Sequence, residues 1–432
     1  MPLNSPSPHR ASARAWLLVL LCGVAGMLFY LDRQTLSVLK TTLKLELGWT
    51  DTQYGWLVSA FMASYTLGYL VSGRWIDRWG TRRAMPVCLG VMSVAALGCG
   101  LAQTLPQMTA FRALLGMAEA GVVPAVMVAI VTWFPPMWRG TASTIKEPIN
   151  IAGQIIATPV AVACTAMWGW RSAFFAPGVA GLTVALAWWW VDRLPDEGPI
   201  SSRRVPAKSE SYLTTLRRRE LWGVIAARMV SDPAWFFLLY WEPGFLQERV
   251  GLSLGQLGRI GWIPTAVAIV SLVGFGMFSD RLIARSHWSP ARSRRVILQL
   301  LALFAPVLVL LPFVHRPALA IALLCVVRVV MVVWLNFSNL FITDLVPHHV
   351  TGTALALMSA CGAAMGLLCN SLIAPVVSSV GYGVVFATAG CLHPLAALIL
   401  WRVYRTRRDP RPQPAAAVPL PLGELPGALA RE

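Results

Sequence analysis

Apolar runs recur along the whole chain, and their number constrains the fold more than any other feature. Each run has roughly 18 to 26 residues, which is long enough to cross about 30 Å of hydrocarbon as a helix. Of the 432 residues, 56% are hydrophobic and only 13% are charged. The sequence therefore predicts an all-α membrane protein with twelve transmembrane helices. The runs cover residues 15–36, 52–73, 84–102, 107–131, 140–164, 172–191, 221–246, 256–279, 295–313, 317–341, 351–377 and 382–402.

Positive charge is distributed unevenly between the two sides that these helices define. The chain has 36 lysines and arginines and a net charge of +17. With an even number of helices, most of the basic residues fall on the side of the termini, which the positive-inside rule identifies as cytoplasmic. We therefore expect a multi-pass protein of a bacterial inner membrane with both termini in the cytoplasm. The basic charge orients the protein and does not indicate a nucleic-acid partner.

A polar stretch at residues 192–220 divides the predicted helices into six and six. A short segment also repeats across this division, because "GRWIDR" at 73–78 matches "GMFSDR" at 276–281. A duplicated six-helix unit is typical of transporters whose halves rock about a central site. The predicted organisation is two pseudo-symmetric bundles: an N-terminal bundle at 1–191, a cytoplasmic linker at 192–220, a C-terminal bundle at 221–405 and a disordered tail at 406–432.

The repeated loops place an acid and arginines at the cytoplasmic ends of the second and eighth helices. Such charges can hold neighbouring helix ends together in one state and release them in the other. For the individual arginines, a charge cluster that only sets orientation is the alternative. The predicted gating residues are Gly73, Asp77, Arg78, Arg82, Asp280 and Arg281.

Several longer motifs resemble a known family. "GRWIDRWGTRR" resembles the signature loop of the major facilitator superfamily, whose members have twelve helices in two bundles. "YLDRQTLSV", "LGWTDTQYGWLVSAF", "FRALLGMAEAGVVPA" and "RRRELWGVIAARMVSDPAWFF" resemble its anion:cation symporter branch, and particularly the hexuronate and related sugar-acid carriers. The chain departs from the family pattern at Lys146 and Glu147, where the region is usually uncharged, and at Trp138, where an acid is common.

Charged residues inside the predicted helices are the best indicators of a site. Each costs roughly 2.5–3.5 kcal/mol at a helix centre, so those of the first half must face one another or a wet cavity. Arg112 and Glu119 are two helical turns apart and share one face, which suits separate partners on other helices or a substrate between them. Asp32 and Arg33 point about 100° apart, so they can serve different neighbours.

These four residues receive separate predicted roles. Arg33 is expected to bind the cargo carboxylate with its guanidinium fork. Asp32 is expected to pair with Arg112 and to release it when protonated, and Glu119 to carry a coupling proton. In the resembled family, the matching residues serve proton coupling and substrate binding. The alternative is a structural ion-pair network between the first and fourth helices.

Further polar side chains extend the candidate binding site into both halves. Lys146, Asn150 and Gln154 form a stripe on the fifth helix, where Lys146 meets either a second anionic group of the cargo or only nearby charges. On the seventh helix, Arg228 and Asp232 are expected to neutralise each other. The remaining substrate-binding candidates are Tyr30, Tyr65, Trp235, Arg328, Asn339 and Ser359, of which Tyr65 and Trp235 are also typical of structural packing.

The sequence as a whole predicts a proton-coupled symporter that imports an organic anion, a hexuronate or related sugar acid, by alternating access. The alternative is a carrier or exporter of another organic anion, such as an aldonate, an aldarate or an aromatic carboxylate. A non-transporting sensor is less favoured, because the cytoplasmic stretches are too short for a signalling domain. We expect a monomer without catalytic residues, metal or cofactor, since no catalytic constellation appears and the eight cysteines lack metal-ligand spacing.

Overall fold

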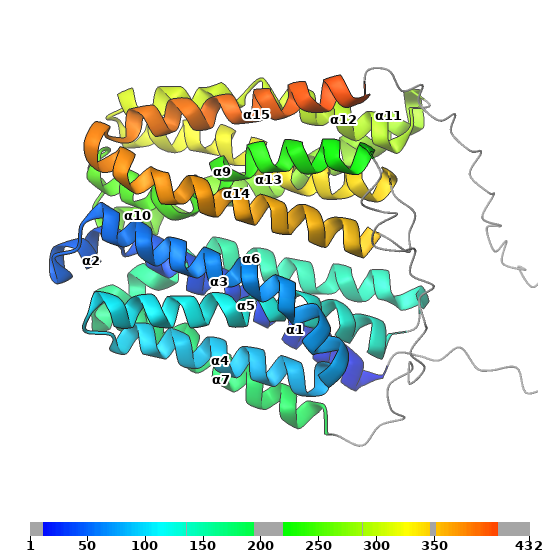
Figure 1. Ribbon diagram of the computed structural model, residues 1–432, viewed down its shortest axis with the longest axis horizontal. Coiled ribbons are helices and arrows are strands. Elements are labelled where there is room, and N and C mark those ends of the chain that lie inside the picture. The colour runs from blue at the N-terminus through cyan, green and yellow to red at the C-terminus, as the bar shows by residue number, and fades with distance from the viewer. Residues whose placement is uncertain (1–11, 135, 194–218, 287, 346–350, 405–432) are drawn as a thin grey trace, which may run out of the picture.

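The regular elements of the described residues are all helices in this computed structural model (Figure 1). The structure describes residues 12–134, 136–193, 219–286, 288–345 and 351–404. The predicted tail at 406–432, and nearly all of the predicted linker at 192–220, lie outside these ranges. The boundaries of the two predicted bundles therefore remain predictions.

The helices fall into two successive sets. The first set is α1 (Ala13–Val38), α2 (Lys40–Leu47), α3 (Asp51–Trp79), α4 (Thr81–Leu101), α5 (Leu105–Trp133), α6 (Pro136–Trp168) and α7 (Ser172–Val191). The second set is α9 (Arg219–Glu248), α10 (Leu254–Ile260), α11 (Ile263–Ser286), α12 (Pro290–Ala302), the 3-10 helix η1 (Ala305–Phe313), α13 (Pro317–Leu345), α14 (Thr351–Val380) and α15 (Tyr382–Tyr404). We refer to these sets as the first and second halves.

The twelve predicted spans correspond to these elements. The eighth span begins in α10 and continues in α11, and the ninth is shared by α12 and η1. Within the described residues, ten helical segments are long and apolar enough to cross a membrane. The other two spans are α3 and α9, which have 29 and 30 residues but carry more polar side chains along their length. At about 1.5 Å per residue, both helices are longer than the thickness of the hydrocarbon core.

Each half packs mainly within itself, and a few helices join the halves. In the first half α3 packs on α5 and α1 on α6, and in the second half α9 packs on α14 and α11 on α13. Contacts between the halves run from α1 to α9, from α3 to α14 and from α6 to α10 and α11. Figure 1 shows α1 beginning and α15 ending at one end of the molecule, the terminal end, with α2 and α10 at the opposite, far end.

The turn from α2 to α3 is fixed by local capping at the far end. Gly48 ends α2 with a φ of 68°, a conformation that favours glycine. Thr50 then caps α3: its side chain accepts from the backbone N–H of Gln53, and the Gln53 side chain accepts from the Thr50 N–H at 2.9 Å. This turn holds the start of α3 against α2.

Close packing of α1 on α6 depends on glycine. A methyl group added at Gly26 of α1 would lie 1.7 Å from the Asn150 side-chain oxygen, and one at Gly153 of α6 would lie 2.6 Å from the Cα atom of Met27. Small residues allow transmembrane helices to approach closely where apolar burial gives no driving force. This approach presses α1, which carries the best candidate residues, against its neighbour.

Candidate functional site

Four buried charged side chains join α1 to α5. The Nε atom of Arg33 pairs with Oε2 of Glu119 at 2.9 Å. Arg112, two turns earlier on α5, donates from Nη1 to the backbone carbonyl of Asp32 at 3.2 Å. Each of the four residues is at most 6% exposed. We call Asp32, Arg33, Arg112 and Glu119 the central cluster.

Several polar atoms of the central cluster have no hydrogen-bond partner among the described residues. They are both carboxylate oxygens of Asp32, Nη2 of Arg33, Oε1 of Glu119, and Nε and Nη2 of Arg112. Buried polar groups are nearly always hydrogen-bonded, since an unsatisfied one costs about 1–3 kcal/mol. The central cluster therefore has donors and acceptors left for a further polar partner, an arrangement that a purely structural network would avoid.

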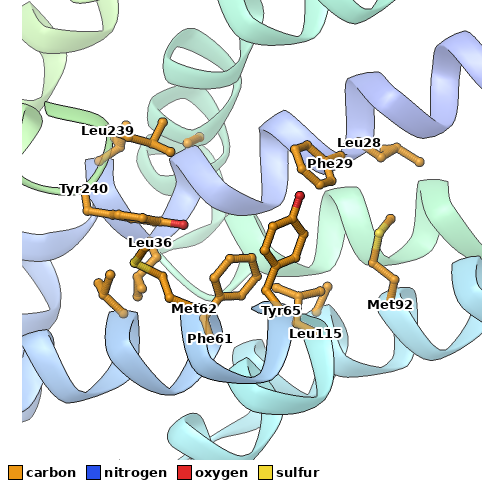
Figure 2. Close-up of a cluster of buried hydrophobic side chains, with 14 of the residues drawn as sticks. Leu28, Phe29, Leu36, Phe61, Met62, Tyr65, Met92, Leu115, Leu239 and Tyr240 are labelled. Carbon is orange, nitrogen blue, oxygen red and sulfur yellow. The ribbon is translucent and has the colours of Figure 1, made fainter. Parts of the chain in front are cut away.

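Aromatic rings surround the guanidinium of Arg33. Its Cζ atom lies 3.8 Å from the ring centre of Phe29, 4.3 Å from that of Tyr65 and 5.0 Å from that of Phe61. Cation–π contacts of this kind stabilise a desolvated cation. Figure 2 shows these rings with Tyr240 of α9 directed toward them. Because α9 belongs to the second half, Arg33 lies close to where the halves meet.

The contacts of the two arginines in the central cluster differ from those that the sequence predicts. Arg112 contacts the carbonyl oxygen of Asp32 and not its carboxylate, and the residue that pairs with Arg33 is Glu119. The reason is geometric: α5 runs beside α1, so Arg112 and Glu119 on one face of α5 reach two neighbouring residues of α1. Arg112 and Glu119 do have separate contacts, as their spacing predicts.

Two predicted tyrosines lie near Arg33. The hydroxyl of Tyr65 is 2.9 Å from the hydroxyl of Tyr69, one turn along α3, so the side chain has a structural partner as well as its contact with Arg33. The ring of Tyr30 is half-buried and stands edge-on to Phe29, with 5.4 Å between the ring centres. Both tyrosines therefore belong to the aromatic surroundings of the central cluster.

The polar stripe predicted on the fifth helix lies on α6. Lys146 is 5% exposed, and Asn150 and Gln154 are half-buried. Asn150 packs directly against Gly26, so its side of α6 faces α1, the helix that carries Arg33. The side chain of Glu147 is outside the described part of the structure.

The predicted pair of Arg228 and Asp232 is present on α9. Nε and Nη2 of the arginine donate to the two carboxylate oxygens at 2.7 and 2.9 Å. Nη1 also donates to the hydroxyl of Ser338 at 3.0 Å and to the side-chain oxygen of Asn339 at 3.1 Å, both on α13. Asn339 is thus tied to this pair, while Ser359 is half-buried on α14.

A second ion pair between helices involves Arg328 of α13. Its Nε and Nη2 atoms lie 2.9 and 2.7 Å from Oε2 of Glu242 on α9. The half-buried ring of Trp235 lies 5.8 Å from the Arg328 guanidinium. Sequence reasoning named Arg328 and Trp235 but not the pairing of Arg328 with Glu242, which lies 86 residues away in the sequence.

Among the predicted gating residues whose side chains the structure describes, Arg82 forms an ion pair within the first half. Arg82 pairs with Asp192 at 3.1 Å, and Asp192 also pairs with Arg14, so the ends of α1, α4 and α7 are linked. Burial raises the pKa of Asp192, and the two arginines act in the opposite direction. Arg78 and Arg281 are exposed. The side-chain surroundings of the other three, Gly73, Asp77 and Asp280, lie outside the described part of the structure.

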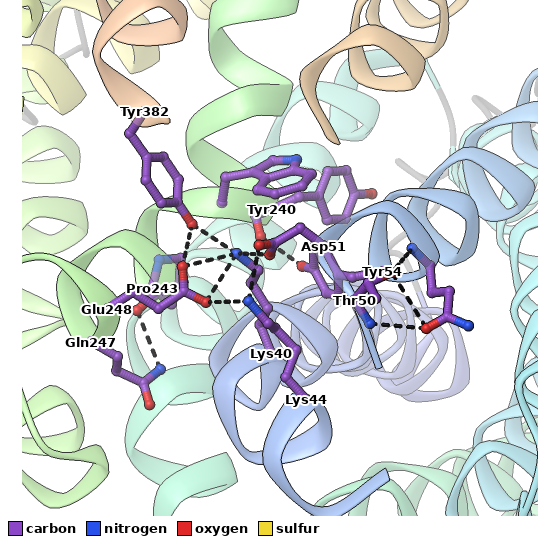
Figure 3. A network of polar contacts seen from close by, with 12 residues as sticks. Lys40, Lys44, Thr50, Asp51, Tyr54, Tyr240, Pro243, Gln247, Glu248 and Tyr382 are labelled. Atoms are coloured by element: carbon purple, nitrogen blue, oxygen red, sulfur yellow. Dashed lines mark hydrogen bonds and ion pairs between the residues drawn. The ribbon is translucent and has the colours of Figure 1, made fainter. Parts of the chain in front are cut away.

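A network of charges that the sequence analysis did not single out joins the halves at the far end (Figure 3). Lys40, whose side chain is fully buried, lies 2.8 Å from Asp51 and 3.3 Å from Glu248 of α9. Lys44 pairs with the same two acids at 2.9 and 3.2 Å. The Tyr382 hydroxyl accepts from Lys40 at 2.7 Å and donates to Glu248 at 2.8 Å. We call these five residues the far-end network.

Backbone contacts between the halves lie next to the far-end network. The Ser37 hydroxyl donates to the carbonyl of Leu239 at 2.9 Å, and the Tyr54 hydroxyl donates to the carbonyl of Tyr240 at 2.6 Å. The Gln247 amide donates to the carbonyl of Val38 at 3.1 Å. These bonds hold α1 and α3 against α9 near the far end.

We expect Glu248→Gln to loosen the far end. The substitution removes the negative charge that both Lys40 and Lys44 share across the halves. It also takes one acid away from the ammonium group of Lys40, whose side chain is fully buried, and a buried charge without its partner is destabilising. Cross-linking between cysteines placed at Ser59 and Ser371 reports this contact, because the two hydroxyl oxygens are 3.3 Å apart across the halves. The cross-linked fraction should fall roughly twofold or more.

The control for this experiment is Asp344→Asn, which breaks the pair of Asp344 with Arg294 inside the second half. It should leave the cross-linked fraction unchanged. Equal cross-linking in Glu248→Gln and the parent protein would show that the far-end network does not hold the halves together.

Comparison with known proteins identifies the family. The family model of the Major Facilitator Superfamily matches residues 22–370, well over half of the chain. The chain belongs to the major facilitator superfamily. It is accordingly a multi-pass membrane transport protein and not an enzyme.

Curated relatives of this chain include transporters named for sugar acids. The hexuronate transporter of Escherichia coli (strain K12) is 25% identical over 92% of this chain and 98% of its own length. A probable galactarate/D-glucarate transporter of the same organism is 26% identical over 85% of this chain and 87% of its own length.

A solved structure shows the same fold. A bacterial homologue of the human lysosomal transporter Spinster, in an inward-facing and occupied conformation, superposes with a TM-score of 0.74. It shares 17% sequence identity, over 92% of this chain and 98% of that chain. At this identity, the likeness shows the fold alone.

Proposed function

We propose that this protein imports an organic anion, a hexuronate or a related sugar acid, together with protons. The observation that carries the proposal is the central cluster, in which buried acids and arginines keep unpaired polar atoms. A guanidinium with a free edge suits a carboxylate, which accepts two parallel hydrogen bonds. The sugar-acid cargoes of the relatives are of the same chemical kind.

Charge balance explains why a proton would accompany the cargo. Asp32 and Glu119 carry two negative charges, and Arg33 and Arg112 carry two positive charges, so the central cluster is neutral when all four are ionised. A bound carboxylate would leave one buried negative charge, which is costly in a low-dielectric interior. Protonation of Glu119 or Asp32 restores neutrality, and protonation of Glu119 also frees Arg33 for the cargo.

The direction of access follows from the far-end network. Among the described residues, polar contacts between the halves gather at that end and hold the halves together there. We assign the terminal end to the cytoplasm, because the basic residues concentrate on that side. We infer that this state releases cargo toward the cytoplasm, and we propose that the protein works as a monomer in the bacterial inner membrane.

The experiment that tests this function is uptake into liposomes containing the purified protein. Labelled galacturonate, glucuronate and galactonate are supplied on the acidic side, and accumulation is measured with and without the pH gradient. We expect gradient-dependent accumulation of at least one sugar acid, with about 1.4 kcal/mol available for each pH unit and transported proton. Uptake of none of them would reject the proposal.

We expect Asp32→Asn to reduce proton-driven accumulation of the cargo by roughly tenfold, equivalent to about 1.4 kcal/mol. The carboxylate of Asp32 makes no hydrogen bond to a described residue, so its loss removes a proton acceptor without removing a contact of Arg33. The KM for the cargo should stay within about twofold of the parent value. A larger change in KM than in accumulation would assign Asp32 to binding instead.

A further inference from the structure

The two inter-helix ion pairs occupy equivalent positions in the duplicated halves. Arg33 and Glu119 are 86 residues apart, and Glu242 and Arg328 are also 86 residues apart. Each pair joins the first and the fourth spanning helix of its half, α1 to α5 and α9 to α13. The signs are exchanged: the first half has arginine on the first helix, whereas the second half has glutamate there.

The second pair shares the chemical features of the first. Glu242 and Arg328 are 3% and 4% exposed, and an aromatic ring, that of Trp235, lies beside the arginine. The pair uses only Oε2 of the glutamate, and Nη1 of Arg328 makes no hydrogen bond to a described residue. Part of this guanidinium therefore remains available to another acceptor, as at Arg33.

Stability alone does not account for such a pair. A buried ion pair often contributes no more than well-packed apolar residues, and ionisable groups inside a membrane protein indicate function. At the second-half positions that correspond to Asp32 and Arg112, the chain has Trp241 and Ile321, so only the paired arginine and glutamate are repeated. Each half therefore has one buried arginine that pairs with one buried glutamate.

We propose that Glu242 and Arg328 form a second anion site, which binds the other carboxylate of a sugar acid that carries one at each end. This inference rests on the proposed function and extends it to dicarboxylates. Protonation of Glu242 releases Arg328 for the second carboxylate, as protonation of Glu119 releases Arg33 for the first. A cargo with two negative charges then enters with two protons on the paired acids, and the buried charge stays balanced.

The test compares two probes in liposomes containing the purified full chain: galacturonate with one carboxylate and galactarate with two. The double variant Glu242→Gln with Arg328→Gln removes both charges and keeps polar side chains of similar size. Galactarate uptake should fall about tenfold or more, while galacturonate uptake stays within about twofold, because the lost charge-assisted contact serves only the second carboxylate. The control is Arg294→Gln with Asp344→Asn, which neutralises another ion pair of α13 and should change neither uptake.

The possible outcomes separate this inference from the proposed function. Wild-type uptake of galacturonate without galactarate overturns the second site and leaves the proposed function standing, whereas uptake of no sugar acid rejects the proposed function itself. Equal loss of both uptakes in the folded double variant, or loss of neither, shows that the pair only holds α9 to α13. If the double variant fails to fold, Arg328→Lys replaces it and should raise the KM for galactarate but not for galacturonate.

Discussion

Glu119→Gln should abolish proton-driven accumulation of the cargo while sparing counterflow exchange. Glutamine cannot release a proton, so each transport cycle loses the step that couples cargo to the pH gradient. Exchange needs only binding and reorientation of the loaded carrier, and Arg33 stays available to the carboxylate once its ion pair at 2.9 Å is gone. With a gradient of two pH units, about 2.7 kcal/mol of driving force per proton is lost, and the accumulation ratio should fall from roughly 100 to 1.

The matched control is Glu46→Gln, the same change at an exposed glutamate of α2. It should leave accumulation at the parent level. Full pH-driven accumulation in Glu119→Gln would remove Glu119 from the coupling mechanism. Loss of both accumulation and exchange would indicate that the Arg33–Glu119 pair is needed for folding or binding instead.

Arg33→Lys should raise the KM for the cargo by roughly ten- to a hundredfold, with a smaller effect on proton movement. Lysine keeps the positive charge but lacks the planar fork that gives a carboxylate two parallel hydrogen bonds, and one charge-assisted bond is worth about 1.5–3 kcal/mol. The ammonium group also fits less well among the rings of Phe29 and Tyr65, which lie 3.8 and 4.3 Å from the present guanidinium.

Arg171→Lys provides the comparison for this substitution. Arg171 is exposed and its guanidinium also lies over an aromatic ring, 4.3 Å from that of Trp170, but outside the central cluster. Its replacement should leave KM unchanged. An unchanged KM in Arg33→Lys would show that the cargo carboxylate binds elsewhere.

The spanning helices could be predicted from the sequence because each rests on a local apolar pattern. The Arg228–Asp232 pair could be predicted for the same reason, since a spacing of four on one helix fixes the geometry. Contacts between residues on different helices could not be predicted in this way. The spacing of Arg112 and Glu119 predicts that they face one direction, but which atoms of α1 they meet depends on how closely α1 and α5 approach.

Two features of the structure could not be predicted, because no local sequence pattern indicates them. Lys40 and Glu248 stand at the ends of apolar runs, where solvated charges are ordinary, and only the packing of the halves buries Lys40. Glu242 gave no local sign of its partner Arg328. The equal separation of 86 residues in the two pairs was a usable signal, since a duplicated fold repeats its inter-helix contacts.

The central claim is that cargo and protons move together through the central cluster. Its most direct test is proton flux measured in liposomes containing the purified protein, with no pH gradient or membrane potential, when galacturonate is added outside. We predict that the outside medium becomes alkaline as galacturonate enters, and that this proton uptake disappears in Glu119→Gln. Entry of galacturonate without accompanying proton uptake would contradict the account.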